Sequence, residues 1–112
     1  MYGLFGRATV RNLSAEEVAE GVTAGRYLLI DVREGHEAAE ERIAGAILVP
    51  LSQLDPLDLP NPQGREVVFY CASGARSAKA AEIAQAAGLA YEAHLAGGLR
   101  SWKSKGLPLE TP

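Results

Sequence analysis

The sequence contains a single cysteine, Cys71, in a chain of 112 residues. One cysteine cannot form a disulfide within the chain, and the two histidines, His36 and His94, lie too far from it in sequence to suggest a zinc site. No apolar run approaches the roughly 20 residues that a membrane-spanning helix requires. A glycine-rich phosphate loop and a dinucleotide-binding fingerprint are also missing, so we predict no metal and no cofactor.

The first residues lack the basic start and the long apolar stretch of a secretion signal, which with the single cysteine favours a reducing, cytoplasmic location. The formal net charge of −3 and the pI of about 5.3 argue against a general binder of nucleic acids or anionic membranes. The length and the 47% hydrophobic content suit one domain with one core. We interpret residues 1–8 as an N-terminal arm and residues 9–112 as that domain.

Short apolar runs alternate with helix-favouring segments along the domain. The expected strands occupy residues 9–13, 27–32, 46–49, 66–70 and 93–95. A first helix is expected after a capping box at Ser14 and Glu17. Further helices are expected at residues 34–42, 77–87 and 99–105. One helical turn is expected at residues 51–54 and a proline-containing loop at 55–64. This alternation predicts an α/β fold in which helices cover both faces of a parallel sheet.

Cys71 directly follows the apolar run at residues 66–70, so it is expected at the C-terminal end of a central strand, where such sheets bind ligands. A lone cysteine in this position is often only a small buried hydrophobe. The residues after it favour a functional role instead, because small side chains let successive backbone N–H groups curl into an anion-holding nest. These loop residues are Ala72, Ser73, Gly74 and Ala75.

Two further features are expected to favour a thiolate at Cys71. The helix predicted to begin near Ser77 points its positive end at the loop, and Arg76 adds a permanent positive charge. Combined, these effects can lower the thiol pKa by about two units from its usual value of about 8.5, which leaves it mostly ionised at neutral pH. The hydroxyls of Ser73 and Ser77 are candidate donors to a bound sulfur, although Ser77 is equally interpretable as a helix cap.

Asp31 and Arg33 are expected to support the site rather than to react. Asp31 ends a buried strand, where it can cap the next segment or pair with Arg33 or Arg76. Arg33 is interpreted as an ion-pair partner of a nearby acid.

Other polar and aromatic residues receive plainer interpretations. Trp102 is expected to pack in the core, and His36 and His94 show no partner pattern. A solvated helix face is expected for three cations, although a position at the site rim stays open: Arg100, Lys103 and Lys105.

Four segments resemble signatures of the rhodanese family of sulfurtransferases, in order and spacing. They are Asp-Val-Arg-Glu at 31–34, Arg-Ile-Ala-Gly-Ala-Ile-Leu-Val-Pro at 42–50, Cys-Ala-Ser-Gly-Ala-Arg-Ser at 71–77 and Gly-Gly-Leu-Arg-Ser-Trp at 97–102. Two positions depart from the usual pattern, since Arg42 stands where the family has His and Ala38 where an aromatic often follows Glu37. Both departures bear on the packing around the second expected helix.

The resemblance implies a three-layer α/β/α fold with a five-stranded parallel sheet. It also implies sulfur transfer through a persulfide on Cys71, from an anionic donor such as thiosulfate to cyanide in vitro or to a thiol or protein in the cell. The nest from Ala72 to Ser77 would hold the outer sulfur, and Arg76 would assist. A small open site would let the acceptor reach Cys71.

Two other functions stay open. Cysteine-dependent phosphatases and arsenate reductases share a cysteine, a loop and an arginine before a helix, but such loops hold five residues, whereas four separate Cys71 from Arg76. The shorter loop suits a single sulfur atom, and it lacks a carboxylate to protonate a leaving oxygen. The other alternative is a non-catalytic rhodanese-like module that binds proteins or senses sulfide.

Overall fold

Five parallel strands form one sheet, in the order β1-β5-β4-β2-β3. The computed structural model describes residues 8–112. The predicted arm, apart from residue 8, and the expectation about a secretion signal concern residues outside this range. The strands are Arg11–Leu13 (β1), Tyr27–Asp31 (β2), Ile47–Leu48 (β3), Glu66–Tyr70 (β4) and Ala93–Leu95 (β5). The predicted α/β class and the five-stranded parallel sheet are confirmed.

Helices connect the strands at the expected places. They are Ala15–Thr23 (α1), Gly35–Glu40 (α2), Ala75–Ala86 (α3) and Gly98–Ser104 (α4), with 3₁₀ turns at Leu51–Gln53 (η1) and Pro56–Asp58 (η2). Two expectations were wrong in detail: α3 begins at Ala75 rather than at Ser77, and the segment expected as a plain loop contains η2. Within residues 8–112, each helix is too short or too polar to cross a lipid bilayer.

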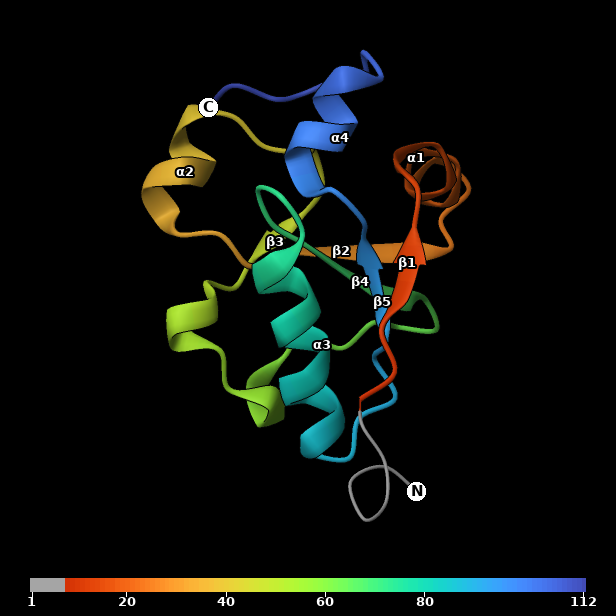
Figure 1. Ribbon diagram of the computed structural model, residues 1–112, viewed down its shortest axis with the longest axis vertical. Helices are drawn as coiled ribbons and strands as arrows, with labels where there is room; N and C mark the ends of the chain where they lie inside the picture. The colour runs from red at the N-terminus through yellow and green to blue at the C-terminus, as the bar shows by residue number, and fades with distance from the viewer. Residues whose placement is uncertain (1–7) are drawn as a thin grey trace.

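Each face of the sheet carries its own core (Figure 1). On one face, α1 and α4 pack Val18 and Trp102 against the central strands, as predicted for Trp102. On the other face, the small alanines of α3 let the helix approach Ile30 and Phe69 closely. The uninterrupted apolar runs of β2 and β4 follow from this arrangement, because both strands are covered on two sides.

The predicted capping box starts α1. The Ser14 hydroxyl accepts from the Glu17 N–H at 3.1 Å, and the Glu17 carboxylate accepts from the Ser14 N–H at 2.9 Å. Two free N–H groups at the helix start are thereby satisfied.

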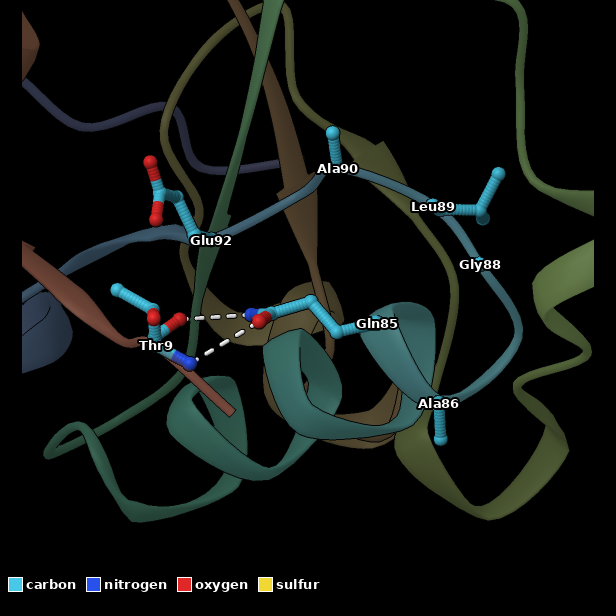
Figure 2. A pocket seen from close by; sticks show the side chains of 7 residues that line it. All are labelled: Thr9, Gln85, Ala86, Gly88, Leu89, Ala90 and Glu92. Carbon is cyan, nitrogen blue, oxygen red and sulfur yellow. Dashed lines mark hydrogen bonds between the residues drawn. The ribbon is translucent and has the colours of Figure 1, made fainter. Parts of the chain in front are cut away.

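The chain entering β1 is tied to the end of α3 by Gln85 (Figure 2). The Gln85 amide accepts from the Thr9 N–H at 3.0 Å and donates to the Thr9 carbonyl at 2.7 Å and the Tyr91 carbonyl at 3.3 Å. These contacts lie before β1 and β5, at the N-terminal edge of the sheet. They close the end of the domain that lies opposite Cys71.

A buried ion pair sits at the end of β2. The Arg33 guanidinium donates to both oxygens of Asp31, at 3.0 and 2.8 Å, and the Tyr70 hydroxyl donates to the same carboxylate at 2.9 Å. Asp31 and Arg33 are 2% and 3% exposed, so each charge depends on the other. The predicted pairing with Arg33 is confirmed. Tyr70 also accepts from the Ile43 N–H, which joins β4 to the chain before β3.

The two positions near α2 that depart from the family pattern are accommodated by local contacts. Arg42 forms an antiparallel bridge and a side-chain ion pair with Glu110 near the C-terminus. Ala38 is 3% exposed, so a small residue fills this position within the fold.

We expect Arg33→Met to lower the free energy of unfolding by about 3–5 kcal/mol, because it leaves a buried carboxylate without a counter-charge. Arg11→Met is the matched control, since the Arg11–Glu66 pair is largely exposed and its loss costs no more than about 1 kcal/mol. Urea unfolding of the three proteins measures both values. An Arg33→Met protein as stable as the control would contradict the importance of the pair.

Candidate functional site

The sulfur of Cys71 lies in a cup of hydrogen-bonding groups. It accepts from the N–H of Gly74 at 3.1 Å and the N–H of Ser77 at 3.3 Å, and it lies 3.6 Å from the Ser77 hydroxyl oxygen. Cys71 follows β4 directly, and the rest of its surroundings belong to the core on the α3 side. The Cys71 side chain is therefore surrounded by apolar residues of the core, while hydrogen-bonding groups contact its sulfur.

Gly74 creates this cup by its backbone conformation. Its φ of 111° lies in the left-handed region, so the chain turns into α3 at once and Gly74 becomes the N-cap residue. Ser77 then occupies the third position of the helix, where its N–H has no partner within the helix and is free to bind sulfur. The interpretation of Ser77 as a cap was wrong, because the helix starts two residues earlier than its sequence suggested.

Hydrogen bonds outweigh burial in setting the acidity of the thiol. Burial alone would raise the pKa of Cys71, but the Ser77 hydroxyl and the N–H groups of Ser77, Gly74 and Ser73 bring that pKa below its usual value. The direction agrees with the sequence prediction. The cause differs in part, because the Ser77 side chain acts alongside the backbone nest.

The first turn of α4 fixes the orientation of the Cys71 loop. The N–H of Leu99 donates to the Cys71 carbonyl at 2.8 Å, and the N–H of Arg100 donates to the Ala72 carbonyl at 3.0 Å. Gly98 permits this contact, since a Cβ there would lie 2.5 Å from the Cys71 carbonyl oxygen. The carbonyls at the start of the loop are thereby held by α4.

Arg76 is engaged by a carboxylate instead of pointing a free charge at the loop. Its guanidinium donates to both oxygens of Glu37 on α2, at 2.7 and 2.9 Å. The hydrogen bond from Arg76 lowers the pKa of Glu37 to about 2, so the carboxylate stays ionised at neutral pH. Sequence reasoning did not foresee Glu37, which the fold brings to Arg76 from 39 residues away.

The remaining predicted site residues lie around the loop. Ser73 and Ala75 are exposed, and none of the hydrogen bonds of Asp31 and Arg33 reaches the loop. Lys103 pairs with Glu41 and Lys105 with Glu16, as expected for a solvated helix face.

The contact of His94 with Ser77 was not evident from the sequence. His94 lies on β5 and is 5% exposed, and its Nδ1 atom lies 2.8 Å from the Ser77 hydroxyl oxygen. Sequence reasoning found no partner for His94, whereas the fold gives it Ser77 and Asn12. The signal was present in the strand pattern, because a histidine within a buried three-residue strand needs polar partners.

Cys71 is 1% exposed, so the expectation of an open site was also wrong. The loop folds over the sulfur instead of displaying it.

Comparison with known proteins bears on this geometry. The profile of the family described as Rhodanese-like domain matches residues 14–105, which include the whole loop and its supporting helices. The chain belongs to the rhodanese-like family. This confirms the resemblance drawn from the four sequence segments.

Relatives of this rhodanese-like chain include named sulfurtransferases. It is 37% identical to a sulfurtransferase of Allochromatium vinosum, over 76% of this chain and 79% of that protein. It is 29% identical to the human thiosulfate:glutathione sulfurtransferase, over 83% and 93% of the two chains. A Synechocystis protein described as uncharacterized is 44% identical over 72% of this chain, which spans only 45% of that relative's length.

Solved structures share the fold. A rhodanese-related protein from Thermoplasma volcanium is 30% identical with a TM-score of 0.80, over 91% of this chain and 99% of its own. A Rhodopseudomonas palustris protein of unknown function, described as a possible tyrosine phosphatase, is 29% identical with a TM-score of 0.77, over 90% and 85% of the two chains.

We expect Gly98→Ala to move the loop and raise the pKa of Cys71, because the new Cβ would collide with the Cys71 carbonyl at a positive φ. Thiolate absorbance against pH measures this shift, and the chain has one cysteine to which a thiolate signal can be assigned. Gly106→Ala is the control: it also has a positive φ, but its Cβ would meet open space. Equal shifts in both variants would contradict the docking role of Gly98.

Proposed function

We propose that this chain is a sulfurtransferase that carries a sulfane sulfur on Cys71. The Cys71 thiolate attacks the outer sulfur of a donor such as thiosulfate, a new S–S bond forms, and sulfite leaves with the electron pair of the broken bond. A second nucleophile then takes the outer sulfur and restores the thiolate. Charge is conserved, since thiolate and thiosulfate dianion become anionic persulfide and sulfite dianion.

The observation that carries this proposal is the set of N–H groups of Gly74 and Ser77 around the sulfur at the start of α3. Such groups stabilise a negative sulfur before and after it is loaded. The N–H groups of Ala75 and Arg76 also lie in the first turn of α3, where no helical carbonyl satisfies them. They are our candidates for binding the outer sulfur, which extends about 2 Å beyond Sγ.

A small thiol is our candidate acceptor. The human and yeast relatives are named thiosulfate:glutathione sulfurtransferases. We propose a glutathione-like thiol for this chain as well. The cytoplasmic location and the absence of nucleic-acid and membrane partners stay predictions from the sequence.

Phosphatase chemistry is the second candidate, since one structural neighbour is described as a possible tyrosine phosphatase. Leaving alkoxides need a proton from a general acid, whereas sulfite does not. Glu37 is the carboxylate held at Arg76, and its pKa of about 2 leaves it without a proton to give at neutral pH. This supports sulfur transfer over phosphate-ester cleavage.

We expect thiosulfate to add one sulfur atom to the protein, as seen by mass spectrometry of the intact chain. Cys71→Ser should abolish the gain, and thiocyanate formation from cyanide should fall to background. An aryl phosphate tested in parallel should not be cleaved. A folded chain that gains no sulfur would favour the non-catalytic module, and cleavage of the phosphate would favour the phosphatase.

We expect Glu37→Gln to lower the KM for thiosulfate about two- to five-fold, because Arg76 then presents an uncompensated charge to the anionic donor. Glu82→Gln on α3 is the control, because this substitution removes the same charge from a residue that pairs with Lys79. Steady-state rates against thiosulfate concentration measure the effect. An unchanged or raised KM would show that Arg76 does not act on the donor.

A further inference from the structure

A continuous chain of hydrogen-bonding groups runs from the Cys71 sulfur to the edge of the sheet. The sulfur lies 3.6 Å from Ser77 Oγ, which lies 2.8 Å from His94 Nδ1, and His94 Nε2 lies 2.7 Å from Asn12 Oδ1. Cys71, Ser77 and His94 are 1%, 0% and 5% exposed, whereas Asn12 is exposed. The chain therefore links a secluded thiol to a solvent-facing side chain.

The sheet register holds the far end of this chain. Asn12 and His94 are direct partners on the parallel strands β1 and β5, so their side chains leave the same face together. Ser77 meets them from α3, which packs on that face. The imidazole also lies against Gly74, where a Cβ would come within 3.8 Å of its Cε1 atom.

The partners define where the protons sit. The carbonyl oxygen of Asn12 only accepts, so His94 Nε2 carries the hydrogen. The neutral ring then offers Nδ1 as an acceptor at 2.8 Å, nearer to Ser77 Oγ than its other acceptor, the Gly74 carbonyl at 3.2 Å, so the Ser77 hydroxyl donates to Nδ1. Burial lowers the pKa of His94 and supports this neutral state as long as Cys71 is a thiol.

We propose that His94 is a positioning residue that accepts the thiol proton of Cys71 through Ser77, an inference that rests on the proposed function. The Ser77 hydroxyl gives its proton to His94 Nδ1 and receives the proton of the Cys71 S–H. No electrons are exchanged, and the products are a thiolate, an intact hydroxyl and an imidazolium. The imidazolium then donates to Ser77, whose hydroxyl hydrogen faces the thiolate.

The surrounding charges are compatible with this transfer. Near the sulfur, the charged residue on α3 is Arg76. Glu37 on α2 forms an ion pair with it, and Glu34 acts more weakly on the same guanidinium. Around His94, the neighbouring strands contribute Asn12 and Phe69 at its register, and neither carries a charge. The thiolate is thus the partner that offsets a buried imidazolium, and the two groups titrate as a pair.

The test is the pH titration of thiolate absorbance in the absence of any sulfur donor. Since Cys71 is the only cysteine, the signal has one source. We expect Ser77→Ala and His94→Gln each to raise the apparent pKa of Cys71 by about one unit. The double variant should match the singles, because both remove the same path. His36→Gln, at the other, exposed histidine, is the control and should not shift it.

A gain of function separates this role from damage to the fold. Asn12→Asp places a carboxylate at His94 Nε2, which favours the imidazolium, so the thiolate should form at lower pH than in the parent protein. Histidine NMR should show His94 protonated at neutral pH in the reduced protein and neutral in Cys71→Ala.

Two results would overturn the proposal: pKa values of Cys71 in Ser77→Ala and His94→Gln equal to the parent value, or a neutral His94 ring beside a formed thiolate. Failure of sulfur transfer with these shifts intact would refute only the proposed function. Sulfur transfer with unshifted titrations would refute only the role of His94.

Discussion

The contact between the first turn of α4 and the carbonyls of Cys71 and Ala72 governs the whole site. The N–H groups of Leu99 and Arg100 hold these two oxygens and so fix the path of the loop between β4 and α3. Gly98 makes the contact possible because it lacks the Cβ that would strike the loop. The acidity of the thiol is set by the Ser77 hydroxyl and the N–H groups of Ser77, Gly74 and Ser73, and α4 holds the loop that leads into them.

The sheet topology makes this contact possible. β4 and β5 are neighbours, and each leads at its C-terminal end into a helix, α3 on one face and α4 on the other. The loop after β4 is thus held between two helix starts, one giving N–H groups to its sulfur and one to its carbonyls. Partial positive charge converges on the loop from both sides.

Local rules were enough for the features that local sequence determines. The apolar runs of β2 and β4 and the capping box at Ser14 followed from spacing and residue type. The pairing of Asp31 with Arg33 was foreseen because the partners lie two residues apart. Contacts between elements distant in sequence were not foreseen: Glu37 reaches Arg76, and His94 reaches Ser77, only through the fold.

The burial of Cys71 was also beyond sequence reasoning. An open site was expected in so compact a chain, yet Cys71 is 1% exposed. The early start of α3 has a related cause, since the left-handed turn at Gly74 depends on the space left beside Gly97. Tertiary packing decided both features.

The solitary character of Cys71 has one more consequence. Many redox-active cysteines have a resolving cysteine nearby, which converts a modified sulfur into an internal disulfide. This chain offers no such escape, so a sulfenic acid or a mixed disulfide on Cys71 must wait for an external reductant.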